Sequence, residues 1–279
     1  MKKFLFIKIL FFTYLVNSQV QPSTKYAQTI TDKELKELLY VYASDYFAGR
    51  EAGTRGQKLA VDFLKDYYIS LGINSAEGTS PTYFQTMKLI IDRKIINTEN
   101  VAAIIPGSDK PEEYIVITSH LDHIGTHDGE INNGADDDGS GTVAMLEIAE
   151  AFKGAYDKGE GPKRSILFLH VSAEEKGLLG SKYYVENPLY PLDNTVANLN
   201  IDMIGRTDPK RLDKDPNYIY LIGSDRLSQE LHDLSEAANN KFTNLILDYT
   251  FNDLNDPNRF YYRSDHYNFA KNNIPVIFY

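Results

Sequence analysis

The segment 113-EYIVITSHLD-122 decides the fold, because an apolar run of strand length ends directly on chemically active side chains. Two more segments, 166-ILFLHVSAEE-175 and 197-ANLNID-202, repeat this arrangement. Short apolar runs bounded by turn residues are typical of buried strands. In an open parallel sheet, functional groups lie at the carboxyl ends of the strands. These segments therefore predict a sheet edge that gathers several carboxylates and one imidazole.

Strand-like and helix-like segments alternate along the chain. We expect strands at 83–91, 98–105, 113–119, 165–171, 196–203, 217–222 and 274–279. We expect helices at 32–42, 56–71, 140–154, 177–186, 226–240 and 265–272, the first opened by a capping box from Thr31 to Glu34. This alternation predicts an α/β fold in three layers, with a mostly parallel central sheet and helices on both faces.

The first residues, MKKFLFIKILFFTYLVNS, are typical of a secretory signal peptide. A basic start precedes an apolar stretch too short to span a bilayer comfortably, and small residues precede Gln19. The alternative is an uncleaved membrane anchor. We expect a signal peptide at 1–18, a single domain at 19–279 and a secreted or periplasmic protein without stable membrane insertion. Oligomeric state is left open.

Composition excludes several kinds of partner and site. The chain has a formal charge of −10, which becomes −13 without the three lysines of the first 18 residues. Such an acidic protein is a poor partner for nucleic acid or for an anionic membrane. The chain has no cysteine, so disulfides and cysteine-ligated zinc are excluded. Any metal must be held by oxygen and imidazole donors.

The segment 133-NGADDDGSG-141 adds three consecutive aspartates to the predicted sheet edge. Like charges gathered at one place are unfavourable unless cations neutralise them, so a site for two divalent ions is favoured. The spacing of the acidic residues also fits the calcium loop of an EF-hand. That motif requires an entering helix, and the preceding GTHDGEINNGA is too rich in glycine and asparagine to supply one.

The paired side chains in these segments suggest divided roles. Of Glu174 and Glu175, one can bind a metal while the other takes a proton from the activated water. His120 and Asp122 lie two positions apart on an extended chain, so Asp122 can accept a hydrogen bond from the imidazole. Asp202 follows a buried run, where an unpaired charge is costly.

The ordered series HLD, DDD, EE and D resembles the zinc-dependent aminopeptidases of the bacterial leucyl aminopeptidase and aminopeptidase Y type. Their relatives include glutamate carboxypeptidases and glutaminyl cyclases. The resemblance covers about residues 98–279, and GREAGTRG at 49–56 is similar to the amino-terminal region of that family. It implies a zinc-exopeptidase fold, a peptide substrate and an enzyme that hydrolyses N-terminal peptide bonds with a water activated by two zinc ions. The signal peptide implies that this enzyme is exported.

The resemblance also implies a role for each matching residue. His120 and Asp202 would bind one zinc ion, Glu175 would bind the second, and Asp137 would bridge both. Glu174 would be the general base, and Asp122 would orient His120. A cis peptide bond is implied between Asp137 and Asp138. These residue roles come from the family pattern and are expectations at this point.

The resemblance departs from the family pattern at one ligand. The second zinc ion should also take a histidine that lies beyond the last strand, where this sequence stops at Tyr279. We therefore expect a C-terminally incomplete domain. The segment 263-RSDH-266 is expected near the substrate pocket, while His123, His127, His170 and His232 are expected in structural or surface roles. Alternatives are carboxypeptidase or glutaminyl cyclase activity on the same scaffold, or an inactive metal-binding fragment.

Overall fold

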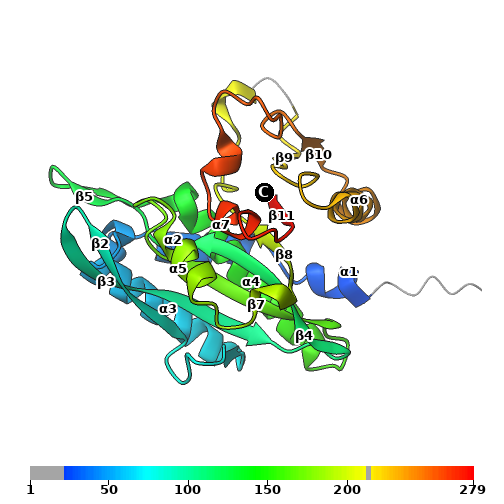
Figure 1. Ribbon diagram of the computed structural model, residues 1–279, viewed down its shortest axis with the longest axis horizontal. Coiled ribbons are helices and arrows are strands. Elements are labelled where there is room, and N and C mark those ends of the chain that lie inside the picture. Colours follow the sequence, from blue (N-terminus) through cyan, green and yellow to red (C-terminus); the bar gives the residue numbers. More distant parts are fainter. Residues whose placement is uncertain (1–21, 212–214) are drawn as a thin grey trace, which may run out of the picture.

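The computed structural model describes residues 22–211 and 215–279 (Figure 1). The helices are α1 (Pro22–Ala27), α2 (Asp32–Tyr42), α3 (Arg55–Leu71), α4 (Gly141–Tyr156), α5 (Leu179–Glu186), α6 (Gln229–Ala238) and α7 (His266–Ala270). Short helical turns are η1 (Asp45–Arg50), η2 (Ala135–Ser140), η3 (Leu192–Asn194), η4 (Pro209–Arg211), η5 (Asn239–Thr243) and η6 (Phe260–Tyr262). The expected signal peptide falls on residues 1–18, outside the described part of the chain.

A central sheet organises the molecule, in the order β1-β3-β7-β4-β8-β11, with β2 also paired to β3. Its strands are β1 (Asn74–Ser75), β2 (Phe84–Ile91), β3 (Lys94–Ile105), β4 (Lys110–His120), β7 (Arg164–Val171), β8 (Thr195–Asn200) and β11 (Val276–Phe278). Strands β7, β4, β8 and β11 run parallel. The pairings of β3 with β1, β2 and β7 are antiparallel.

The sheet is therefore mixed rather than mostly parallel, and short connections explain the difference. Only two residues separate β2 from β3, which permits a hairpin but not a parallel crossover. The parallel half is the half in which strand ends converge on the predicted site. Helices cover both faces, so the predicted α/β fold is confirmed.

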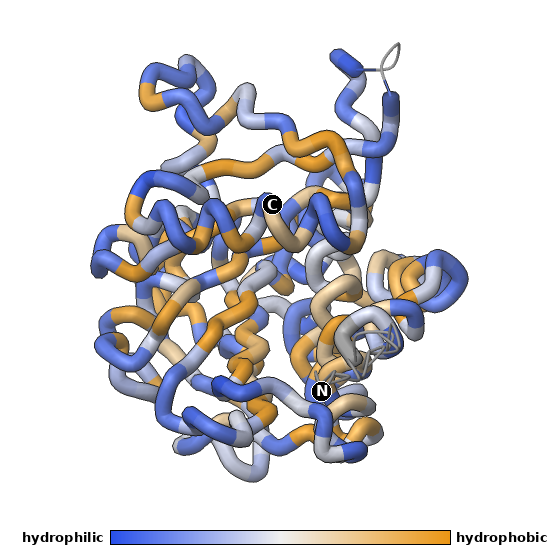
Figure 2. The backbone as a smooth tube through the Cα atoms, turned by 90° about the vertical axis from the view of Figure 1, so that its right-hand side faces the viewer, coloured by the Kyte–Doolittle hydropathy of each residue, from blue (hydrophilic) through white to orange (hydrophobic). Residues whose placement is uncertain are grey.

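Two hydrophobic cores lie on opposite faces of the sheet because side chains alternate along each strand. Ile166 and Phe168 face a core shared with α2, α3 and α4. Leu167 and Leu169 face a second core that includes Tyr184 of α5 and Phe269 of α7. Figure 2 shows apolar stretches of backbone gathered inside the molecule and polar stretches in its outer loops.

Local signals place most elements close to their expected positions. Thr31 caps α2 by accepting a hydrogen bond from the amide of Glu34, and Gly72 ends α3 in the left-handed conformation. Strand β8 ends at Asn200, so Asp202 lies just beyond it. None of the helices in the described residues is long and apolar enough to cross a bilayer.

The expected strand at 217–222 is not a strand of the central sheet, and only its last residue, Ile222, forms an isolated bridge to Phe278 of β11. Its central part, β9 (Tyr218–Tyr220), pairs in parallel with β10 (Ile246–Asp248) to form a separate two-stranded sheet. Figure 1 shows β9, β10 and α6 standing to one side of the central sheet, beyond β11. A hairpin of β5 (Gly125–His127) and β6 (Glu130–Asn132) follows β4.

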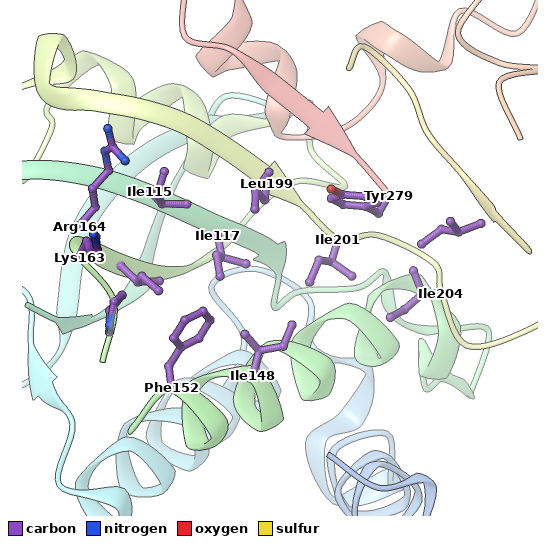
Figure 3. Close-up of a pocket in the computed structure, with 13 residues that line it drawn as sticks. Ile115, Ile117, Ile148, Phe152, Lys163, Arg164, Leu199, Ile201, Ile204 and Tyr279 are labelled. Carbon is purple, nitrogen blue, oxygen red and sulfur yellow. The ribbon is translucent and has the colours of Figure 1, made fainter. Parts of the chain in front are cut away.

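An apolar cavity of about 540 Å³ lies between the sheet and α4 (Figure 3). Ile117 and Leu199 of the sheet face Ile148 and Phe152 of α4 across it, and Tyr279 lies at its border. The acidic residues of the predicted site do not line it. The cavity therefore does not contain the predicted site, although Tyr279 also lines the cleft that does.

Candidate metal centre

The predicted site residues meet at the carboxyl ends of the parallel strands. His120 is the last residue of β4, Glu174 and Glu175 follow β7, and Asp202 follows β8. Asp137 lies in η2, the turn that leads into α4, and the peptide bond between it and Asp138 is cis. Neighbouring strands thus bring together residues that are far apart in the chain. For example, Thr118 of β4 and Asn200 of β8 are 82 positions apart and share a hydrogen bond.

A first cluster forms around His120, whose side chain is 1% exposed. Its Nε2 lies 3.0 Å from Oδ1 of Asp137 and 3.7 Å from Oδ1 of Asp202. Its Nδ1 donates a 3.1 Å hydrogen bond to the backbone carbonyl of Asp122. A carbonyl oxygen only accepts, so the proton of a neutral ring is on Nδ1, and Nε2 presents its lone pair. This is the tautomer that binds a metal through Nε2.

The charge balance of this cluster favours a cation. Burial lowers the pKa of His120, but the carboxylates of Asp137 and Asp202 outweigh it and hold that pKa well above its usual range. The site therefore attracts positive charge strongly, whether a proton or a metal ion. Carboxylate and imidazole donors suit zinc and other divalent metals.

A second cluster contains Asp137, whose Oδ1 also lies 3.0 Å from Nε2 of His120. His123, Asp137 and Glu175 each present one donor atom, and these three atoms lie within 4.8 Å of one another. Nδ1 of His123 is 2.6 Å from Oε1 of Glu175. The expectation that His123 has only a structural or surface role therefore missed its position. The available signal was the spacing HLDH, which places it three residues after His120.

Asp138 also lies near His120 and Asp202, but both of its oxygens are occupied. Oδ1 accepts hydrogen bonds from the amides of Gly141 and Met203, at 2.9 and 3.2 Å. Oδ2 accepts one from the amide of His120 at 3.1 Å. Asp138 therefore holds these loops together, whereas Oδ1 of Asp137 faces Nε2 of His120.

Two further acidic residues lie beside the clusters. Burial and nearby carboxylates raise the pKa of Glu174 to about 9, although His120 opposes the shift. Burial raises the pKa of Asp122 to about 6, against the opposing charge of His120. The Asp122 carboxylate is 3.8 Å from Nδ1 of His120 and instead accepts a hydrogen bond from the amide of Glu174 at 3.1 Å. Its orienting role stays a prediction, since its own carbonyl makes the bond to His120.

The segment 263-RSDH-266 lies next to the site and contacts Asp202. Ser264 donates a 2.6 Å hydrogen bond to Oδ2 of Asp202. Asp265 is buried, accepts a hydrogen bond from Ser181 at 2.5 Å, and burial raises its pKa to about 7. His266 is buried against Phe278, at 4.7 Å between ring centroids, and belongs to neither metal-donor cluster.

Arg50 holds the two loops that present the donors, and it is 1% exposed. Its guanidinium donates to the carbonyls of Leu121, Asn133 and Gly134, at 3.0, 2.7 and 2.8 Å. It also donates to the carbonyl of Tyr42 and lies over the ring of that residue.

The segment before the aspartates is the β5–β6 hairpin, so the EF-hand alternative lacks its entering helix.

An open cleft of about 870 Å³ begins at the acidic residues. One end is lined by Asp137, Glu174, Glu175 and Asp202. The remainder is lined mainly by the segment after β8 and by aromatic side chains, namely Tyr218, Tyr220, Phe251, Phe260, Phe278 and Tyr279. The cleft thus joins a strongly negative end to an apolar wall.

Known proteins share this sequence pattern and fold. The model of Peptidase family M28 matches residues 100–279. Leupeptin-inactivating enzyme 1 of Streptomyces exfoliatus is 32% identical over 172 residues, which cover 61% of this chain and 35% of that protein. The matched regions span only 15–35% of the lengths of the first curated relatives.

Two solved structures show the same fold. The LapA aminopeptidase of Legionella pneumophila superposes with a TM-score of 0.65 at 22% identity, over 92% of this chain and 62% of that one. Glutaminyl cyclase of Porphyromonas gingivalis gives a TM-score of 0.65 at 19% identity, over 89% and 83% of the two chains. The predicted zinc-exopeptidase fold is confirmed.

Proposed function

The chain belongs to peptidase family M28, and on that premise we propose that it is an exported zinc exopeptidase that removes N-terminal residues from peptides. The observation that supports this most directly is the position of Asp137, whose Oδ1 lies 3.0 Å from Nε2 of His120 and whose carboxylate also lies in the cluster with His123 and Glu175. Two ions bridged by one carboxylate are a common arrangement in metal-dependent hydrolases. His120, Asp137 and Asp202 would hold one ion, and Asp137 and Glu175 would hold the second.

The donor set fits divalent metal ions. It contains only imidazole and carboxylate groups, and the buried Nδ1 of His123 and Oε1 of Glu175 have no hydrogen-bond partner among the described residues. Zinc bound there would supply Lewis-acid polarisation of a substrate carbonyl. Relatives named as zinc metalloproteases support zinc as the metal.

The protein's own residues perform the proton transfers. Glu174 lies in the cleft beside both clusters, and its raised pKa of about 9 applies to the acidic cluster without cations. Nearby positive charge would lower that pKa, because it favours the ionised carboxylate. Glu174 would then accept a proton from the attacking water and later donate it to the leaving amine.

Substrate choice follows from the two ends of the cleft. A protonated N-terminal amine is attracted by the carboxylates of Asp137, Glu175 and Asp202, and a hydrophobic side chain can lie on the aromatic wall. A second candidate is carboxypeptidase activity, which is favoured by Lys210 and Arg263 in the same cleft, since cations bind a C-terminal carboxylate.

A substrate panel separates these activities. The purified chain would be assayed with aminoacyl amides, their N-acetylated counterparts, N-blocked dipeptides with a free carboxylate, and peptides with N-terminal glutamine. We expect turnover only of substrates with a free amine, lost with a zinc chelator and restored by Zn²⁺. Turnover confined to N-blocked dipeptides would establish the carboxypeptidase instead. Zinc binding without turnover of any of these substrates would favour the alternative of an inactive metal-binding fragment.

Export is the remaining part of the proposal, and it rests on residues 1–18. Cleavage of the signal peptide would make Gln19 the first residue of the exported protein. Expression of the full chain with N-terminal sequencing of the secreted or periplasmic product checks this. Recovery of the protein with residues 1–18 intact in the membrane fraction would favour the anchor.

A further inference from the structure

The segment GREAGTRG at 49–56 lies beside the site, and three of its consecutive residues contact loops of the site. Gly49 approaches the end of the β5–β6 hairpin so closely that a Cβ there would lie 2.4 Å from the carbonyl oxygen of Asn132. Arg50 holds backbone carbonyls of the loops after β4 and before η2. Glu51 contacts a further part of the site, the loop between β7 and α5.

Glu51 forms an ion pair with Lys176, the residue that follows the two glutamates of the site. Oε1 of Glu51 lies 2.8 Å from Nζ of Lys176, and the two side chains are 29% and 25% exposed. Gly125 of β5 has a φ of +80°, and a Cβ at this position would lie 2.7 Å from both Cβ and Oε2 of Glu51. The lack of a side chain at Gly125 therefore lets Glu51 lie against the hairpin. Glu51 thus links the hairpin to the loop after β7.

The loop after β7 has a strained backbone on both sides of its two glutamates. Ala173 and Leu178 each have a left-handed φ of +59°. Such conformations are unfavourable for residues with a side chain, and they persist only where surrounding contacts impose them. The carbonyl of Glu174 accepts hydrogen bonds from the amides of Gly177 and Leu178, both at 2.8 Å. Lys176 lies within this turn, so its ion pair ties the turn to a neighbouring segment of the chain.

We propose that Glu51 and Lys176 form a positioning pair, which holds the backbone of the β7–α5 loop so that Glu174 and Glu175 keep their places in the site. This inference rests on the proposed function and deepens it. An ion pair of this exposure adds little to stability, because water screens it. Its effect should therefore appear in the geometry of the site, where a shift of about 1 Å at a reacting group can lower a rate by about 10²-fold.

Hydrogen exchange tests the contact in the metal-free chain, without reference to activity. The variants Glu51→Gln and Lys176→Met each remove one partner, whereas Lys176→Arg keeps the charge. We expect the amides of Gly177 and Leu178 to exchange at least about tenfold faster in the first two variants, because the turn opens more often. In Lys176→Arg both amides should exchange at the parent rate. If Glu51→Gln does not fold, the two variants of Lys176 make the same comparison.

A double-mutant cycle tests whether the two residues act as a pair. With an aminoacyl amide, Glu51→Gln and Lys176→Met should each lower kcat by about tenfold at a nearly unchanged KM. Calorimetric titration should show Zn²⁺ binding weakened by about tenfold in both. The double variant should lose no more than either single variant, because the contact is already broken. The control Glu99→Gln breaks the partly buried ion pair of Glu99 with Lys58, at 2.6 Å, and should match the parent in kcat and Zn²⁺ affinity.

The outcomes separate this inference from the proposed function. Parent-like exchange in Glu51→Gln would overturn the contact's role in holding the loop. Faster exchange with parent-like Zn²⁺ affinity and kcat would make the pair a structural contact only, and additive losses in the double variant would show two residues that act separately. Either result overturns the positioning pair and leaves the zinc peptidase standing. A folded parent that binds Zn²⁺ but hydrolyses no peptide would overturn the proposed function instead, while exchange and Zn²⁺ affinity would still decide the role of the pair.

Discussion

Ser264 donates a 2.6 Å hydrogen bond to Oδ2 of Asp202, and this contact ends a buried chain of polar side chains. Ser264 itself accepts from Asn200 at 2.8 Å, and Asn200 accepts from Thr118 at 2.6 Å. The series of hydrogen bonds thus runs from near the carboxyl end of β4, across β8, to a predicted metal ligand. Fully satisfied buried networks hold their members rigidly. The orientation of Asp202 is therefore fixed from inside the sheet.

We expect Ser264→Ala to weaken zinc binding by about 10–100-fold, since a residue that orients a ligand has effects of that size. The loss of one buried hydrogen bond should also lower the free energy of unfolding by about 1 kcal/mol. Calorimetric Zn²⁺ titration and urea denaturation measure the two effects. Ser70→Ala, on the exposed face of α3, is the matched control. Zinc affinity equal to that of the control would show that Ser264 does not position Asp202.

Arg50 gives a second prediction, about stability. Its guanidinium satisfies four backbone carbonyls at once, which the single ammonium of lysine cannot do. We expect Arg50→Lys to lower the free energy of unfolding by about 2–4 kcal/mol, because buried carbonyls lose their donors. Hydrogen exchange should rise in residues 121–124 and 133–138.

Arg55→Lys provides the control for this measurement, since Arg55 is exposed at the start of α3. Urea denaturation of both variants, after metal removal, compares the two arginines directly. Exposed substitutions usually change stability by less than about 0.5 kcal/mol. A change of that small size at Arg50 would contradict its role as the support of the two loops.

Much of the fold could be predicted because local signals and burial agree. Apolar runs marked β4, β7 and β8, and the capping box at Thr31 marked the start of α2. The pairing of β9 with β10 could not be predicted, because a three-residue strand has the same local pattern in either sheet. Its place depends on which partner edge is available, and that is a property of the tertiary structure.

The candidate site was predicted in part. His120 ends a buried strand, Glu175 and Asp202 follow buried strands, and Asp137 lies in the turn before α4. The structure brings these residues together. The position of His123 beside Asp137 and Glu175 was missed, because the resemblance placed the second histidine of the site beyond the last strand. Arg50 and Ser264 were missed as supports since hydrogen bonds to distant backbone and side chains leave no pattern in the sequence.

The third prediction concerns the general base. Glu174→Gln keeps the size of the side chain but cannot accept a proton. We expect the variant to bind zinc as the parent does while turnover falls by about 10²–10⁴-fold. Glu186→Gln, exposed at the end of α5, is the matched control. Parent-like turnover would refute the role of Glu174 as base, and loss of bound zinc would make it a ligand instead.

The last prediction concerns acid stability and depends on His170, which lies in β7 away from the donor clusters. His170 is buried, with Nε2 2.8 Å from the hydroxyl of Tyr68 and Nδ1 3.2 Å from Oγ of Ser119. Burial lowers its pKa to about 3, against an ordinary value of 6.5. Between these two pKa values the unfolded chain binds a proton at this residue and the folded protein does not.

Stability must therefore fall as the pH drops from 6.5 towards 3, by about 1.4 kcal/mol per pH unit from this histidine alone. Above pH 6.5 the residue is neutral in both states, so its contribution does not change with pH. In His170→Gln the free energy of unfolding should depend less steeply on pH by this amount. In His127→Gln, at an exposed position, the pH dependence should be that of the parent. Urea denaturation at pH 4, 5, 6 and 7, with chelator present to remove metal effects, measures the difference. Equal slopes for the parent and His170→Gln would show that His170 is protonated in the folded protein, against the burial argued here.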